Sequence, residues 1–322
     1  MQIKYILIFL LTLAVILVAV LTLSECRTAH IGGEKIISDI VEQSSNESNK
    51  KDKIEKILVF IVDDYYQTYS QKNHYNFIIF DYYGNISFKE TNPRFRSIIS
   101  SSDPYRAVYY NIGACYELAL IFNETASKAG FTSRIVFTNC EDHFWNEVFL
   151  NDSWIHVDPT LFYHYYRDGD DYENSWFNNP EIYNDLSWYN GYSQILVYGS
   201  NEVVSQNYLN LGNLSVITPE NINKIVITPN SSRRDIVIHA NTSNYTISLG
   251  EKGYFVTAEK NSMNPYILYE DTGYAIIIGN ESTSLYLDPR TQKLNVLNIV
   301  FTLITIVVCF EFYVIFKKIK SK

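Results

Sequence analysis

Two long apolar runs, one at each end of the chain, constrain its fold more than any other feature. Residues 5–23 read "YILIFLLTLAVILVAVLTL" without a charge, and residues 295–316 form a second run with one charge, Glu311. A helix of about 20 such residues spans the roughly 30 Å of a bilayer's hydrocarbon core. Both runs are therefore predicted to be transmembrane helices, with Glu311 near enough to its helix end to reach the interface.

A cleaved signal peptide is the alternative for the first run. The apolar part of a signal peptide is usually about 7 to 15 residues long, which is shorter than this run, and a small-residue cleavage site would follow it. No such site follows residues 5–23. We therefore favour an uncleaved anchor.

Lysines at the two ends predict the membrane topology. Lys4 precedes the first run, and four lysines lie in residues 317–322, after the second run. Because such residues stay on the cytoplasmic side, residues 1–4 and 317–322 are predicted to be cytoplasmic and the loop of residues 24–294 to lie outside the cell membrane. Removing the five end lysines and Glu311 from the net charge of −9 leaves this loop at −13, which excludes nucleic acid as an expected partner.

Composition divides the loop into three parts. Residues 24–56 are polar and highly charged, and indicate a stalk. Residues 57–210 are rich in apolar and aromatic residues, and predict the main folded domain. Residues 211–292 contain seven short β-rich runs broken by Gly, Asn and Pro, typical of a small all-β accessory domain, a sandwich or a barrel. The sequence has no phosphate-binding glycine loop, EF-hand loop or close pair of zinc ligands, so no cofactor and no metal is predicted.

Nine N-x-S/T sequons lie in the loop and make it a candidate for N-glycosylation. An Asn-rich and Ser-rich composition is the alternative explanation of their number. The candidate residues are Asn46, Asn85, Asn123, Asn151, Asn213, Asn230, Asn241, Asn244 and Asn280.

Two cysteines, Cys115 and Cys140, lie in the predicted folded domain. Outside the cell, such a pair would ordinarily form a disulfide. The residues after Cys115 form an apolar stripe with helical spacing, through Leu118 and Phe122, and Gly130 is expected to end the helix. Cys115 would then lie in the first turn, where the helix N-terminus stabilises a thiolate. A nucleophile, a disulfide and simple packing all remain open for this residue.

The stretch "TSRIVFTNCEDHFWNEVFLNDSWIHVDPT" predicts a strand followed by a β-hairpin. With "ND" as a two-residue turn, Glu147 lies opposite His156 and is expected to pair with it. His143 and Asp158 then lie on one face as diagonal neighbours, about 7 Å apart at the backbone. Because each side chain would be costly to bury alone, we expect them to pair. With Cys115 they would supply a nucleophile, a base and an orienting acid.

These motifs resemble the transglutaminase-like superfamily, and most closely its peptide:N-glycanase branch. That branch has a G-x-C-x-E-x-A helix start, a D-H-x-W-x-E-V strand and a W-x-H-x-D-P strand, and the chain has "GACYELA", "DHFWNEV" and "WIHVDP". The resemblance covers about residues 90–210 and implies an α+β, papain-like core with a helix-borne Cys packed on an antiparallel sheet. Ala114 and Leu118 stand where the branch has arginine and tryptophan, and the zinc-ribbon cysteines of cytosolic glycanases are missing.

The resemblance implies a membrane-anchored, extracytoplasmic cysteine amidase that hydrolyses the glycosylated Asn side-chain amide of a glycoprotein or glycopeptide. Cys115, His143 and Asp158 would be its catalytic residues. One alternative is a peptidase or cross-linking transglutaminase that acts on envelope proteins with the same triad. Another is a non-catalytic surface module that binds glycans or envelope proteins. The sequence does not predict an oligomeric state.

Three residues near the predicted triad are candidates for substrate binding. They are Glu117, Trp145 and Trp154, for which helix capping and core packing are the competing interpretations. The acidic, aromatic segment of residues 162–193 is a candidate wall of a substrate cleft, or else a variable surface loop.

Overall fold

The computed structural model of the chain separates into two compact units. It describes residues 2–63, 66–67, 78–80, 86–88, 103–168, 189–200, 202–230, 234–294 and 296–320. The first unit comprises residues 1–137, 143–186 and 197–202, and the second comprises residues 138–142, 187–196 and 203–322. Each unit has its own core.

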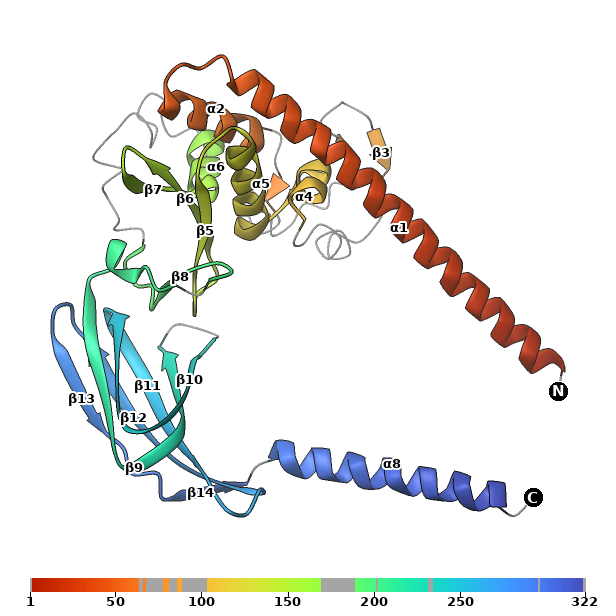
Figure 1. Ribbon diagram of the computed structural model, residues 1–322, viewed down its shortest axis with the longest axis vertical. Helices are drawn as coiled ribbons and strands as arrows, with labels where there is room; N and C mark the ends of the chain where they lie inside the picture. The colour runs from red at the N-terminus through yellow and green to blue at the C-terminus, as the bar shows by residue number, and fades with distance from the viewer. Residues whose placement is uncertain are drawn as a thin grey trace. The chain divides into compact units, whose positions relative to one another are not determined.

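Helices make up most of the described residues of the first unit (Figure 1). They are α1 (Gln2–Ser44), α2 (Lys50–Val62), α4 (Pro104–Tyr110), α5 (Cys115–Lys128) and α6 (Pro159–Asp168). Two short strand pairs accompany them, namely β1 (Tyr66–Gln67) with β4 (Ile112–Gly113), which run parallel, and β2 (Ile78–Phe80) with β3 (Ile86–Phe88), which run antiparallel.

A four-stranded sheet has the order β7-β6-β5-β8. Its strands are β5 (Ser133–Thr138), β6 (Phe144–Leu150), β7 (Ser153–Val157) and β8 (Ile195–Val197). The Asn146 side chain of β6 donates to the carbonyl oxygen of Ala119 in α5 at 3.0 Å. Because side chains alternate along a strand, Val148 and Leu150 also face the helices, whereas Trp145 and Glu147 lie on the opposite face.

The core of the first unit lies where α1, α2, α5 and α6 meet the helix-facing side of the sheet. It contains apolar side chains from all of these elements, among them Ile37, Ile57, Phe122, Val148 and Phe162. Mixed helices on an antiparallel sheet agree with the predicted α+β class of this part of the chain.

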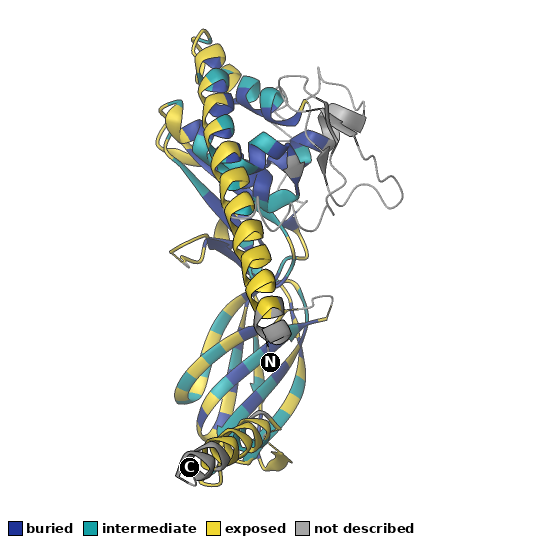
Figure 2. Ribbon diagram, turned by 90° about the vertical axis from the view of Figure 1, so that its right-hand side faces the viewer, coloured by how far each residue is buried: buried dark blue, intermediate teal, exposed yellow. Residues whose placement is uncertain are grey.

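The predicted stalk is wrong, because residues 24–56 are part of this core. α1 continues without a break from the apolar run to Ser44, and its buried residues Ile36, Ile37 and Ile40 pack in the same cluster as α5. Figure 2 shows the change along the helix, from an exposed N-terminal half to a half-buried C-terminal half. The charged residues of this stretch occupy the outer face of an amphipathic helix, which explains its polar composition.

Glycines at positions 32 and 33 let α4 pack closely on α1. A Cβ atom at Gly33 would lie 1.8 Å from the carbonyl oxygen of Tyr105, and one at Gly32 would lie 2.5 Å from the ring of Tyr109. The backbone of α4 occupies the space of a side chain at Gly33, so this crossing requires glycine there.

The second unit contains a six-stranded sheet in which β10-β9-β11-β12-β14 are neighbours in that order and β13 pairs with β9. The strands are β9 (Leu211–Pro229), β10 (Ile236–Gly250), β11 (Lys252–Asn261), β12 (Ile267–Ile277), β13 (Ser282–Tyr286) and β14 (Thr291–Leu294). Two pairs of the predicted β-runs join into single long strands, β10 and β12. β10 stays paired with β9 across register shifts between His239 and Asn244. The sequence thus overestimated the number of turns in this region.

One described helix is long and apolar enough to cross a membrane. It is the span Ile8–Ser44 within α1, with a mean hydropathy of 2.5 in its most apolar window. In the second apolar helix, α8 (Val296–Lys320), the stretch whose side chains are described, Asn298–Tyr313, is apolar but shorter than a full membrane span. Membrane anchoring by the first run is therefore supported, and the second transmembrane helix stays a prediction.

We predict that Gly33→Ala destabilises the first unit. Alanine alone would favour a helix by about 1 kcal/mol over glycine, but the contact with the Tyr105 carbonyl should outweigh this gain and lower the free energy of unfolding by about 1 to 3 kcal/mol. Denaturant unfolding of the full chain in detergent measures the change. The exposed neighbour Glu34→Ala is the control, with an expected change within about 0.5 kcal/mol. A Gly33→Ala protein as stable as the wild type would contradict the close helix crossing.

Candidate functional site

Cys115 is the first residue of α5, as the apolar stripe predicted. The helix has Ala114 in an extended N-cap conformation, and the carboxylate of Glu117 accepts the Ala114 N–H at 2.8 Å. Glu117 is buried and is therefore a helix-capping residue, in agreement with the competing interpretation of its role. The Cys115 side chain is half-buried at the N-terminus of α5, where the first backbone N–H groups have no partner within the helix.

The hairpin has the predicted register. Glu147 lies opposite His156 and Asn146 lies opposite Val157. Asn151 and Asp152 form the turn with φ angles of 50° and 64°, the left-handed values that a two-residue type I′ turn requires.

The same register brings His143 next to Asp158. Their side chains are joined by a bond of 2.6 Å between Nε2 of His143 and Oδ2 of Asp158. Asp158 is fully buried, and its other oxygen, Oδ1, accepts the N–H groups of Thr160 and Leu161 at 3.0 and 3.1 Å. These two bonds cap the N-terminus of α6, whose first residue is Pro159. One carboxylate therefore both starts a helix and orients the imidazole.

The electrostatics of His143 link it to Cys115. Burial acts to lower the pKa of His143, because it disfavours the charged imidazolium. Two neighbours outweigh burial and raise this pKa to about 10. The larger effect comes from the negative charge of Asp158 and its hydrogen bond with the imidazole, and the smaller one from the charge of Cys115 and its hydrogen bond with the imidazole. Because Nε2 faces Asp158, Nδ1 is the ring nitrogen left for the thiol. The structure thus brings together the three residues that the sequence grouped.

The ring of Trp145 stacks on the imidazole of His143. Trp145 is fully buried, and its ring lies parallel to that of His143 with centroids 5.4 Å apart. This burial supports packing rather than substrate contact for Trp145. Trp154 differs from the expectation of a core residue, because 36% of its surface is exposed and the guanidinium of Arg134 covers its ring at 4.2 Å.

A charge network lies on the sheet face that carries Trp145 and Glu147. Arg134 donates to the carboxylate of Glu147 and also reaches Glu202 at 3.4 Å. Burial lowers the pKa of His156 to about 4, although the charge of Asp158 acts in the opposite direction. His156 is therefore neutral at physiological pH, and it lies opposite Glu147 as predicted.

Four aromatic residues contact one another, and we call them the aromatic wall: Tyr116, Phe137, Phe144 and Tyr198. Tyr116 follows the cysteine in the chain, and its ring lies 4.9 Å from that of Phe144, which follows the histidine. Phe144 stacks on Phe137 at 5.4 Å, and the hydroxyls of Tyr116 and Tyr198 lie 3.0 Å apart. Burial and this hydroxyl contact raise the pKa of Tyr116, so its hydroxyl stays neutral. This wall was not predicted from the sequence, in which only the position of Tyr116 beside the cysteine could indicate it.

Cys140 belongs to the second unit, where it is buried in the core of the large sheet among residues such as Leu214 and Tyr254. Burial raises its pKa to about 12. No disulfide joins any of the four cysteines, all of which are among the described residues. The disulfide interpretation of Cys115 is therefore not supported.

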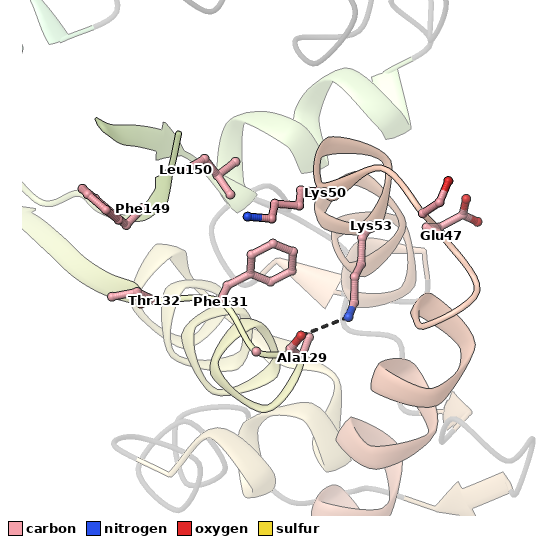
Figure 3. A pocket seen from close by; sticks show the side chains of 10 residues that line it. Glu47, Lys50, Lys53, Ala129, Phe131, Thr132, Phe149 and Leu150 are labelled. Atoms are coloured by element: carbon pink, nitrogen blue, oxygen red, sulfur yellow. Dashed lines mark hydrogen bonds between the residues drawn. The ribbon is translucent and has the colours of Figure 1, made fainter. Parts of the chain in front are cut away.

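One described pocket lies at the opposite end of α5 from Cys115 (Figure 3). It has a volume of about 390 Å³ and is lined by residues of the turn between α1 and α2 and of the α5 C-terminus, including Lys50, Lys53 and Phe131. The 14 residues of α5 separate it from the triad by about 20 Å. It therefore contributes nothing to the chemistry at Cys115.

Within the described ranges, no three His, Cys, Asp or Glu side chains are arranged to hold a metal ion. The candidate cleft wall, residues 162–193, lies largely outside the described residues, and so does Asn85. Asn123 is half-buried on α5, where its side chain accepts a bond from the Ser133 hydroxyl at 2.6 Å, which disfavours glycosylation. The remaining sequon asparagines are exposed: Asn46, Asn151, Asn213, Asn230, Asn241, Asn244 and Asn280.

Residues 39–159 match the family model of the transglutaminase-like superfamily. This range contains all three residues of the predicted triad, so the chain has a transglutaminase-like domain. A solved structure described as the crystal structure of a TGase is 15% identical to the chain, with a TM-score of 0.29. The match covers 47% of this chain and 36% of that one, so this chain spans about a third of the length of that structure. No curated protein sequence matches the chain.

The raised pKa of His143 predicts how stability changes with pH. Because the folded-state pKa of about 10 lies above the ordinary value of 6.5, the protonated imidazole stabilises the fold fully below pH 6.5, and this contribution is lost as the pH rises toward 10. The difference in free energy of unfolding between wild type and His143→Gln should therefore shrink by a few kcal/mol over that range. Denaturant titrations at several pH values measure it.

His156→Gln is the matched control for this titration. Because the pKa of His156 is lowered to about 4, His156 is almost entirely neutral in both states above about pH 7.5, and the effect of its substitution should be constant there. A pH-independent effect of His143→Gln would contradict the proposed charge state.

Alkylation should distinguish the two cysteines of the folded units. With iodoacetamide at neutral pH, we expect Cys115 to react at least ten times faster than Cys140, because Cys140 is buried with a raised pKa. Peptide mapping by mass spectrometry measures both rates, and the unfolded protein, in which both should react alike, is the control. A disulfide-linked peptide pair containing both residues would restore the disulfide interpretation.

Proposed function

We propose that the transglutaminase-like domain is a cysteine amidase of the peptide:N-glycanase type, with Cys115, His143 and Asp158 as its triad. The observation that carries this proposal is the buried bond between His143 and Asp158, beside a cysteine at a helix N-terminus that hydrogen-bonds the same imidazole. This arrangement provides a sulfur nucleophile, a group that carries its proton and a carboxylate that fixes the ring.

The reaction follows from these positions. The Cys115 thiolate attacks the side-chain carbonyl carbon of a glycosylated Asn, and a C–S bond forms as the carbonyl oxygen becomes an oxyanion. The oxyanion then collapses, the C–N bond breaks, and the proton on Nδ1 of His143 goes to the departing glycosylamine. Water next attacks the thioester while His143 takes its proton, which releases an Asp side chain and restores the thiolate.

Two features of the site would stabilise the oxyanion and hold the leaving group. The backbone N–H groups in the first turn of α5 are directed toward the region in front of Cys115, where a developing negative charge is favoured. The aromatic wall offers ring faces for the apolar side of a sugar and two hydroxyls, from Tyr116 and Tyr198, for its polar groups. These features favour a glycosylamine leaving group.

A cross-linking transglutaminase or a peptidase would form a thioester on the same cysteine. The difference lies in the substrate amide and in whether water or an amine attacks the thioester, and the match to the superfamily is compatible with both outcomes. The domain is further proposed to face the outside of the cell membrane, with both chain ends cytoplasmic, as the end lysines indicate.

Conversion of a defined N-glycopeptide tests this proposal. Wild type should release the intact glycan and leave Asp in place of Asn, whereas Cys115→Ala should have no activity. Asp158→Asn should lower kcat by about 10³ to 10⁴, because the imidazole loses its orienting carboxylate. Mass spectrometry of the peptide product measures each rate.

Cys140→Ala is the matched control and should retain wild-type activity, because that thiol lies in the other unit. A new isopeptide bond or a cleaved peptide chain would instead identify the cross-linking or peptidase alternative. Turnover that survives Cys115→Ala would overturn the triad.

A further inference from the structure

α1 joins the predicted membrane anchor to the transglutaminase-like domain without a linker. It is one unbroken helix from Gln2 to Ser44, and its exposed apolar half ends at Leu23, which is 69% exposed. Ala29 is already fully buried, only six residues later. The match to the superfamily begins at residue 39, inside the same helix. Figure 1 shows the helix as a continuous rod, with its C-terminal half against α4.

Polar contacts fasten the domain to α1 directly after the apolar run. The hydroxyl of Tyr110 donates to the carboxylate of Glu25 at 3.0 Å. One turn further on, His30 lies 3.0 Å from the carboxylate of Asp103, which also accepts from Arg106 at 2.7 Å. Together with the glycine contact on α4, these bonds hold α4 along three successive turns of α1. The domain therefore cannot swing about the anchor as it would on a flexible stalk.

The chain length between these contacts limits the height of Cys115 above the membrane. Tyr110 is five residues before Cys115, and five residues span at most about 18 Å. Glu25 is two residues, about 3 Å of helix, beyond the end of the apolar run. Allowing for the two side chains, Cys115 lies within roughly 30 Å of the bilayer surface. A flexible stalk of residues 24–56 could instead have extended over about 100 Å.

We propose that α1 and α4 hold Cys115 at a fixed height, and that its substrates are side-chain amides of proteins bound to the same membrane, within roughly 30 Å of its surface. The reaction itself rests on the proposed function, whereas the height of Cys115 does not. The substrate protein is therefore one that is bound to the membrane, rather than a soluble protein.

Reaction rates on substrates at two heights test the proposal. The full chain is reconstituted in liposomes that carry an N-glycopeptide on a rigid helical spacer of about 20 or about 60 residues, which places the target near 30 Å or near 90 Å. Wild type should convert the near target at least ten times faster than the far one. A variant with about 30 Gly-Ser residues inserted between Leu23 and Ser24 should lose this preference. Both proteins should convert a soluble copy of the peptide at equal rates, which controls for damage by the insertion.

Equal rates on the near and far targets by wild type would overturn the proposal, as would recovery of an active, cleaved protein away from the membrane. A second measurement separates this result from failure of the proposed function. In a Cys26→Ser, Cys309→Ser background, a fluorophore on Cys115 should transfer energy to acceptors on lipid headgroups, and the insertion should reduce the transfer. Equal transfer in both proteins would contradict the fixed height even if no amide were ever converted.

Discussion

The buried carboxylate of Asp158 is the interaction on which the rest of the site depends. A carboxylate with no exposure to water is costly unless its oxygens are hydrogen-bonded, and here both are. One oxygen accepts two backbone N–H groups at the start of α6, and the other meets the imidazole of His143. Because α6 packs in the core through Phe162, the stability of the fold and the orientation of the imidazole rest on the same side chain.

A second contact sets the position of the cysteine relative to this pair. The Asn146 amide of β6 binds the Ala119 carbonyl of α5, one turn after Cys115. The strand that follows His143 and the helix that begins with Cys115 are thus fastened to each other close to the point where thiol and imidazole meet. The helix start and the hairpin are separated by 27 residues at this bond, yet their relative position is fixed by a buried hydrogen bond.

The sequence predicted the parts of this site that local patterns determine. The period of two in the hairpin and its two-residue turn were sufficient to place His143 near Asp158, and the stripe after Cys115 was sufficient to place it at a helix start. Long-range packing was not predictable in the same way. The charged residues around Ile36, Ile37 and Ile40 concealed a buried helix face, and nothing local to Tyr198 indicated that its hydroxyl would meet Tyr116. The location of Cys140 in another unit likewise depends on tertiary packing that two cysteines in a sequence do not reveal.

In the proposed mechanism, the substrate becomes covalently attached to Sγ of Cys115, and rapid-quench mass spectrometry of this intermediate is the most direct test. The full chain is mixed with an N-glycopeptide in excess, quenched in acid within the first turnover and digested. We expect a thioester on the peptide that contains Cys115. The mass added to this peptide should equal the mass of the glycopeptide minus that of the released glycosylamine. Turnover with no adduct on Cys115, or an adduct on another residue, would contradict it.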